Sequence, residues 1–144
     1  MKKILGVLTV IVAIIIGRFI GKTSVETYSS LKKELNLNSI LIKTASNINK
    51  NLPMMVNSEM RLDTTIAIDK TFRYQYTLIN YSVNDITAKE INDKFAKQII
   101  NNVCTTKDME AFVKNDITVI YSYYGKGGKE ITNISVPSYK CKDI

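Results

Sequence analysis

Two cysteines, Cys104 and Cys141, are the most reactive side chains in this sequence of 144 residues, which contains no histidine. Without an imidazole, and without metal-ligand spacing between the cysteines, a metal site is not expected, nor is a cofactor. Cysteines persist as disulfides in oxidising compartments such as the bacterial periplasm. A bridge would close a loop of about 38 residues and contribute about 4 kcal/mol on the chain-entropy model. The alternative is two unrelated buried thiols.

Carboxylates are the other candidates for chemistry, and the three nearest to predicted strand ends are Asp63, Asp69 and Asp116. Each stands where a turn or a cap commonly has an aspartate. A hydrolase without histidine needs a Ser-Lys or carboxylate arrangement, and a cysteine nucleophile would have to give up the bridge. The glycine-rich segment 125–128 joins two predicted strands, so no helix dipole follows it to bind phosphate. The sequence therefore favours a protein that is not an enzyme.

The N-terminus predicts a membrane anchor. Two lysines precede an apolar run from Ile4 to Gly17. This run is short for a bilayer that needs about 20 residues, but Arg18 can snorkel and so extend the span to residue 21. No small-x-small cleavage site follows, which favours an anchor over a cleaved signal peptide. We expect residues 1–22 to hold the chain in the bacterial inner membrane through residues 4–21, and residues 23–144 to form one periplasmic domain.

The formal charge of +7 does not indicate nucleic-acid binding. Four of the twenty basic residues lie in the first 22 positions, and the other sixteen face thirteen acidic residues, which leaves +3. Lysines between positions 89 and 114 alternate with acidic residues, as they do on solvated helix faces. No nucleic-acid partner is expected.

The elements that carry these residues follow from hydrophobic periodicity. Apolar residues spaced three or four apart predict a helix that ends before Pro53, and Thr87 with Glu90 forms a capping box at the start of another. The sequence predicts helices at about 25–51, from 87, and from Thr105 with Asp108 at its third position, and strands at 61–68, 72–82, 117–124 and 130–136. This order predicts an α+β domain with an antiparallel sheet of about four strands in two hairpins, and helices on one face.

Strand alternation also predicts a recognition surface. If Phe72 and its alternate neighbours point to the helices, the residues between them point away. The second face would then carry an exposed apolar and aromatic patch for a partner, formed by Ile79, Tyr81, Ile120 and Tyr124. Aromatic residues are enriched at such interfaces. The alternatives are that these residue types merely suit strands, or that the first helix covers this face.

A wider pattern runs from Asn51-Leu52-Pro53 at a helix end, through a strand pair and a helix leading into Cys104, to a short helix, the strand that begins at Ile117, a glycine turn and a closing Cys141. This pattern resembles the small periplasmic pilotins of type II secretion, in the branch with a helix-plus-sheet fold. The resemblance implies a disulfide and a domain that grips a short helical segment of a secretin subunit. In that family a lipidated N-terminal cysteine carries the cargo to the outer membrane. This chain has an apolar run in its place.

Together these features predict a non-catalytic, inner-membrane-anchored periplasmic module that recognises another cell-envelope protein. Within that class we expect an exclusion or immunity-type factor of a conjugative element or phage, because such a factor needs only an anchor and a recognition face. The alternative is a pilotin-like assembly factor for a secretin or pilus system.

Overall fold

The computed structural model of the protein describes residues 34–142. The predicted anchor at residues 1–22, its membrane contact through residues 4–21 and the domain boundary at residue 23 lie outside the described residues. Between residues 34 and 142, none of the helices combines the length and the apolar character needed to cross a membrane.

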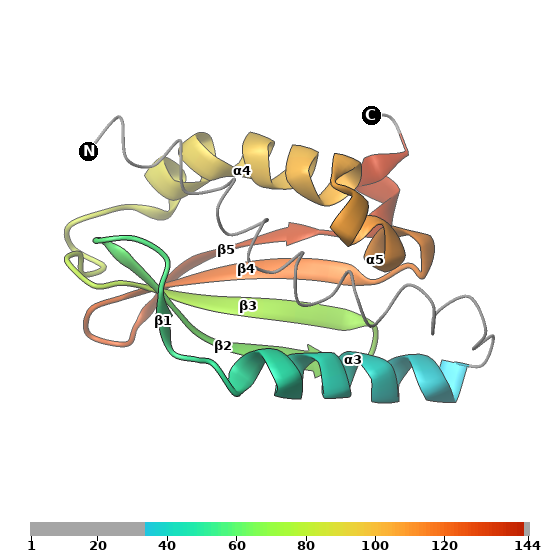
Figure 1. The fold of residues 1–144 in the computed structure, drawn as a ribbon. Helices are drawn as coiled ribbons and strands as arrows, with labels where there is room; N and C mark the ends of the chain where they lie inside the picture. Colours follow the sequence, from blue (N-terminus) through green and yellow to red (C-terminus); the bar gives the residue numbers. More distant parts are fainter. Residues whose placement is uncertain (1–33, 143–144) are drawn as a thin grey trace.

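Five strands form one mixed sheet in the order in which they occur along the chain (Figure 1). The neighbouring strands are antiparallel, except that β3 and β4 are parallel. The predicted α+β class is confirmed, but the prediction of an antiparallel sheet of about four strands is wrong. The strands are β1 (Met54–Met55), β2 (Met60–Ile68), β3 (Thr71–Leu78), β4 (Thr118–Gly125) and β5 (Glu130–Val136).

The parallel pair arises from the long connection between β3 and β4. Both predicted hairpins, β2–β3 and β4–β5, are present. Residues 79–117 form the helices on the sheet and connect the end of β3 to the start of β4. Because β4 starts beside the start of β3, the two strands run in the same direction. Such crossovers are how parallel neighbours are joined. Periodicity locates strands, but it does not say which edges pair.

The helices pack on one face of the sheet, as predicted, because their buried residues belong to the same core cluster as the inward-facing side chains of the strands. In Figure 1 the helices lie along the two borders of the sheet. Helix α3 packs along β2, and α4 packs along β5. Between α4 and β4 the chain forms a 3-10 turn and a short helix, and a second 3-10 turn follows β5. These elements are α3 (Glu34–Asn49), α4 (Ala88–Thr105), η1 (Lys107–Met109), α5 (Glu110–Lys114) and η2 (Ser138–Cys141).

The predicted capping box at the start of α4 is confirmed. The Thr87 hydroxyl accepts a hydrogen bond from the Glu90 backbone N–H, and the Glu90 carboxylate accepts one from the Thr87 N–H at 2.8 Å. The latter bond holds the pKa of Glu90 below its usual value. The predicted helix start at Thr105 is wrong. Helix α4 continues through Thr105, whose hydroxyl donates back to the Asn101 carbonyl at 2.8 Å and so caps no following turn.

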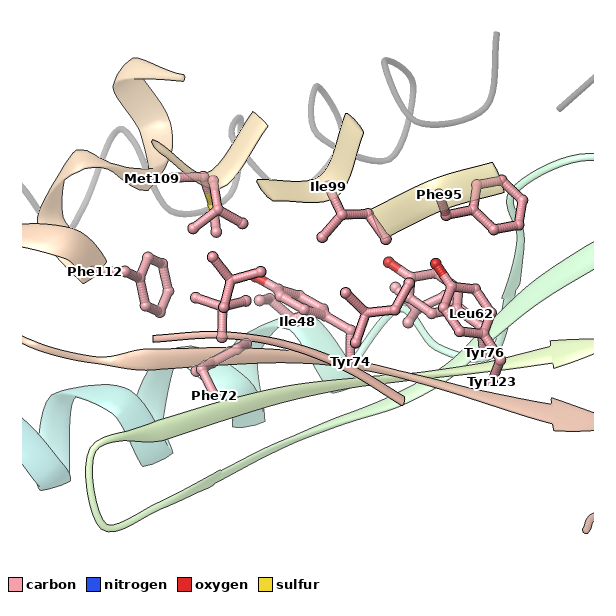
Figure 2. Packing of buried hydrophobic residues seen from close by; sticks show 14 of the residues in the cluster. Ile48, Leu62, Phe72, Tyr74, Tyr76, Phe95, Ile99, Met109, Phe112 and Tyr123 are labelled. Atoms are coloured by element: carbon pink, nitrogen blue, oxygen red, sulfur yellow. The ribbon is translucent and has the colours of Figure 1, made fainter. Parts of the chain in front are cut away.

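Tyrosine side chains of β3 and β4 form the side of the core that belongs to the sheet (Figure 2). The parallel register places Tyr74 beside Tyr121 and Tyr76 beside Tyr123. The ring centroids of these pairs are 5.3 and 5.7 Å apart, and Phe95 of α4 stacks on Tyr123 at 5.7 Å. The hydroxyls of Tyr74 and Tyr76 are buried and have no hydrogen-bond partner among the described residues. Stacked aromatic rings therefore join the sheet to α4.

Candidate protein-recognition surface

The side of the sheet that faces away from the helices is the outer face. The buried residues of the helices in the described part of the chain all pack with the inner-face side chains, so none of these helices covers the outer face. Alternation and strand register determine which side chains it carries. Its main residues are Arg61, Ile66, Ile68, Thr71, Arg73, Gln75, Thr77, Thr118, Ile120, Ser122, Tyr124, Asn133 and Ser135.

A bulge in β2 determines which of its side chains point outward. Strict alternation from Leu62 would place Ile66 and Ile68 on the inner face. The register shifts between Leu62 and Thr64, so these two isoleucines instead face outward. Their side chains are 37% and 60% exposed. Sequence reasoning missed both residues, and the one available signal was the polar run at positions 63–65 in the middle of the strand.

The same bulge turns Thr65 inward, where it contacts α3. The Asn49 side-chain oxygen accepts from the Thr65 N–H at 2.7 Å, and the Asn49 amide donates to the Thr65 carbonyl at 2.8 Å. The Thr65 hydroxyl lies 2.9 Å from the Asn49 oxygen and 3.2 Å from the Ala45 carbonyl. The Asn49 amide thus pairs with this stretch of β2 as a neighbouring strand would, and it fixes α3 on the sheet.

Replacing Asn49 with alanine should lower the free energy of unfolding by about 2 kcal/mol, because it leaves the buried polar groups of Thr65 unpaired. Urea denaturation monitored by circular dichroism measures the change. Asn47→Ala is the matched control, since Asn47 lies exposed on the same helix and accepts a hydrogen bond from the exposed Lys50. Equal effects of the two substitutions would contradict the role assigned to Asn49.

Polar side chains occupy the middle of the outer face. Asp63 pairs with Arg61 and accepts a hydrogen bond from the Thr77 hydroxyl. On the next strand, the Tyr124 hydroxyl lies 3.5 Å from the Gln75 amide nitrogen. Burial raises the pKa of Tyr124, and a hydrogen bond to the Glu130 carboxylate raises it further. The Arg73 guanidinium lowers the pKa of Tyr124 and so opposes both effects. The outer face is therefore not one continuous apolar patch.

The four predicted partner-binding residues are not all brought together. Ile120 and Tyr124 lie on the outer face of β4 and are half-buried. Ile79 follows β3, and its N–H donates to the Glu59 carbonyl at 3.0 Å. Tyr81 lies beyond the strand, packs partly against the core, and its hydroxyl lies 3.4 Å from a Glu59 carboxylate oxygen. Partner binding by these four residues stays a prediction.

Tyr81 does not lie on the outer face, because β3 ends before it. The strand ends at Leu78, four residues before the predicted end at position 82. The loop that follows crosses close to Gly125, where a Cβ atom would meet the Tyr81 carbonyl and the Ser82 Cα at 3.1 Å. The Lys126 N–H donates to the Tyr81 carbonyl at 2.7 Å. Only glycine permits this approach without movement of the loop.

Each of the three candidate carboxylates has a structural role. Asp63 belongs to the polar cluster with Arg61, and Asp69 lies in the β2–β3 turn with a φ of 45°. Asp116 has a φ of 54° and accepts a hydrogen bond from the Ser138 hydroxyl at 2.7 Å. Within residues 34–142 no three His, Cys, Asp or Glu side chains come close enough together to hold a metal ion.

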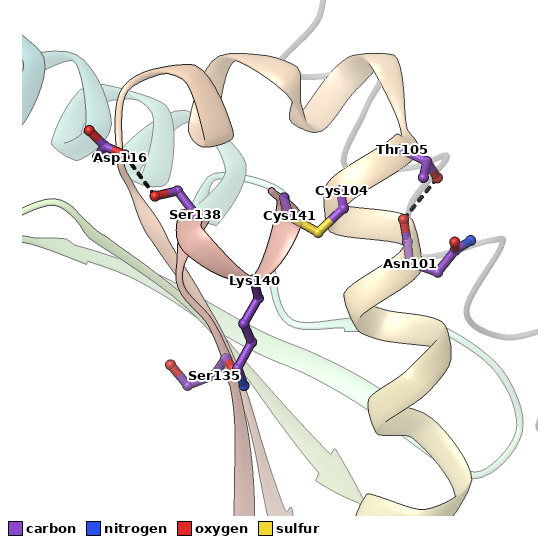
Figure 3. Close-up of a disulfide and its surroundings, with 8 residues drawn as sticks. All are labelled: Asn101, Cys104, Thr105, Asp116, Ser135, Ser138, Lys140 and Cys141. Carbon is purple, nitrogen blue, oxygen red and sulfur yellow. Dashed lines mark hydrogen bonds between the residues drawn. A yellow bond between two sulfur atoms is a disulfide. The ribbon is translucent and has the colours of Figure 1, made fainter. Parts of the chain in front are cut away.

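A disulfide joins Cys104 to Cys141, with their Cα atoms 5.1 Å apart (Figure 3). Cys104 lies in the last turn of α4, and Cys141 ends η2. Beside the bond, the Lys140 ammonium donates to the Ser135 carbonyl at 3.0 Å. The disulfide thus fastens the segment after β5 to the helix that covers that edge of the sheet.

The sequence matches one protein family. The model of the family described as "Domain of unknown function (DUF8479)" matches residues 25–132, which is most of the chain. No curated protein matches the sequence at a significant level.

Three solved structures share the fold. PA3611 from Pseudomonas aeruginosa, a predicted secreted protein, aligns with a TM-score of 0.63 and 13% identity over 78% of this chain and 98% of its own. The type II secretion pilotin AspS from Vibrio cholerae aligns at 0.56 and 15%, over 75% and 94%. The type II secretion pilotin EpsS from Vibrio vulnificus aligns at 0.59 and 10%, over 76% and 94%. The structural resemblance to the pilotins is therefore confirmed, and at these identities it establishes the fold.

Proposed function

We propose that this chain, which belongs to the family described as "Domain of unknown function (DUF8479)", is a non-catalytic recognition module of the cell envelope that acts as a pilotin-like assembly factor for a secretin or pilus system. The observation that carries the proposal is the fold, because nearly the whole length of each of two pilotins aligns with this domain. The recognised partner would be another envelope protein.

The disulfide supports an extracytoplasmic location. Cytosolic thiols are kept reduced, whereas a bond such as Cys104–Cys141 persists in the periplasm. We therefore propose that the domain lies in the periplasm, with the apolar residues 4–21 in the inner membrane. An anchored domain would act on its partner at the inner membrane and would not travel with it, because a transmembrane helix inserts almost irreversibly.

The proposed function is tested by deleting the gene in its host and following the assembly of envelope multimers. We expect secretin or pilus subunits to remain unassembled or mislocalised, and assembly to return when the wild-type gene is supplied. Normal assembly of every such system in the deletion strain would contradict the proposal. Plasmid transfer and phage entry are measured in the same strain, because the exclusion role expected from the sequence stays a prediction that no observation favours.

A further inference from the structure

Three outer-face residues on adjacent strands form a row that we call the Ile-Arg row: Ile66 of β2, Arg73 of β3 and Ile120 of β4. Ile66 is the register partner of Arg73, and Arg73 is the register partner of Ile120. Neighbouring strands are about 4.8 Å apart, so the row spans about 10 Å. Ile68, two residues beyond Ile66, adds an apolar side chain that is 60% exposed.

We propose that the Ile-Arg row and Ile68 are the docking surface for an acidic, amphipathic segment of the partner protein. A carboxylate of that segment pairs with the Arg73 guanidinium, and its apolar side chains cover the isoleucines. The inference rests on the proposed function and specifies the surface and the chemistry by which the partner is recognised.

The positive charge of Arg73 is the reason to expect a carboxylate on the partner segment. Its guanidinium carries five N–H donors. It contacts the Ser122 hydroxyl at 3.4 Å and also the Tyr124 hydroxyl, but no carboxylate in the described part of the chain forms an ion pair with it. Arg61 on the same face, by contrast, is paired with Asp63. A planar guanidinium between two isoleucines suits a carboxylate, which it can bind through two parallel hydrogen bonds.

The apolar part of the surface follows from the bulge in β2. The bulge places small side chains under α3 and leaves Ile66 and Ile68 in solvent. Exposed apolar side chains that are grouped on one sheet face mark a candidate interaction site. The flanking arginine also suits an interface, because arginine is enriched there and lysine is depleted.

The charge also disfavours a second copy of this chain as the occupant. In a two-fold symmetric pair centred on the row, the same patch would face itself, and Arg73 would approach its own counterpart. Outside the first 22 residues the chain keeps a formal charge of +3, so an acidic segment is weakly attracted over a longer range as well.

The test uses the full chain in its host, with the photocrosslinking residue p-benzoylphenylalanine at position 68. The matched control carries it at position 97, where Lys97 is exposed on α4. We expect a protein adduct from position 68 and none from position 97. The captured peptide should contain Asp or Glu beside apolar residues. Arg73→Glu should reduce the adduct by roughly tenfold, as expected for loss of a charge-assisted pair, and exchange of the partner's acidic residue for arginine should restore it.

Arg73→Gln keeps the size of the side chain, and thermal melts of both Arg73 variants show whether the domain remains folded. An adduct that a folded Arg73→Glu variant leaves unchanged would overturn the proposal. So would an adduct with a second copy of the chain or with residues 1–33, or the absence of any adduct at position 68. An adduct at position 97 alone, with assembly still dependent on the gene, would remove this surface and retain the proposed function. An adduct at position 68 with normal assembly in the deletion strain would retain this surface and contradict the proposed function.

Discussion

Replacing Cys104 and Cys141 together with serine should lower the free energy of unfolding by about 4 kcal/mol. The bond closes a loop between residues 37 apart in sequence, and the chain-entropy model assigns about that stabilisation to a loop of such length. Domains of this size are stable by roughly 5–15 kcal/mol, so the loss is a large part of the total. Urea denaturation at neutral pH measures it, and a dithiothreitol-treated wild type should give the same value.

Ser138→Ala is the control for the disulfide. Ser138 lies in the same segment as Cys141, and its replacement removes the hydrogen bond to Asp116 but leaves the disulfide intact. The free energy of unfolding should therefore fall by less than about 1 kcal/mol, as for other exposed polar contacts. Equal unfolding curves for the wild type and the double serine variant would show that the bond does not contribute to stability.

Alkaline unfolding should begin steeply above pH 10. Burial raises the pKa of Tyr74, Tyr76 and Tyr123 well above 10, and it raises the pKa of the half-buried Tyr121 as well. A raised pKa in the folded state stabilises the fold below the unfolded pKa of 10 and loses that contribution as the pH increases above it. Each tyrosine should then cost about 1.4 kcal/mol for each pH unit above 10. Tyrosinate absorbance and circular dichroism should therefore change together.

Tyr76→Phe tests the origin of this effect. It removes one buried ionisable group, so the alkaline midpoint should move to higher pH, whereas Tyr139→Phe, at a side chain that is 63% exposed, should leave it unchanged. At pH 7 the Tyr76→Phe variant should be about 1 kcal/mol more stable than the wild type, because the hydroxyl it removes is buried without a described partner. A destabilised Tyr76→Phe variant would show that the hydroxyl has a partner, such as a buried water molecule.

Local signals in the sequence predicted local structure well. The capping box at Thr87 marks the start of α4, and the span predicted for β5 is the observed one. These features succeed because their causes lie within a few residues, in a cap that satisfies backbone donors or an alternation that selects a strand. The second short helix was misplaced because Thr105, a plausible cap, bonds back into α4.

The candidate surface was predicted only in part. Ile120 and Tyr124 face outward because alternation within β4 holds. Tyr81 does not join them because β3 ends at Leu78, where the following loop meets the backbone at Gly125. Ile66 and Ile68 were missed because a single bulge exchanges the two sides of β2, and the Thr65 that it turns inward is bonded to Asn49, sixteen residues away in the sequence.

By itself, the sequence determined the α+β class, most of the helices and strands, and the two cysteines that come to be joined, because these depend on residue type and short-range periodicity. The tertiary structure alone decided that β3 and β4 run parallel, that tyrosines stack across them, and that Arg73 lies between two isoleucines on an uncovered face. The physical reason is that strand pairing and register bring together residues from distant parts of the chain, and no local pattern records which edges will meet.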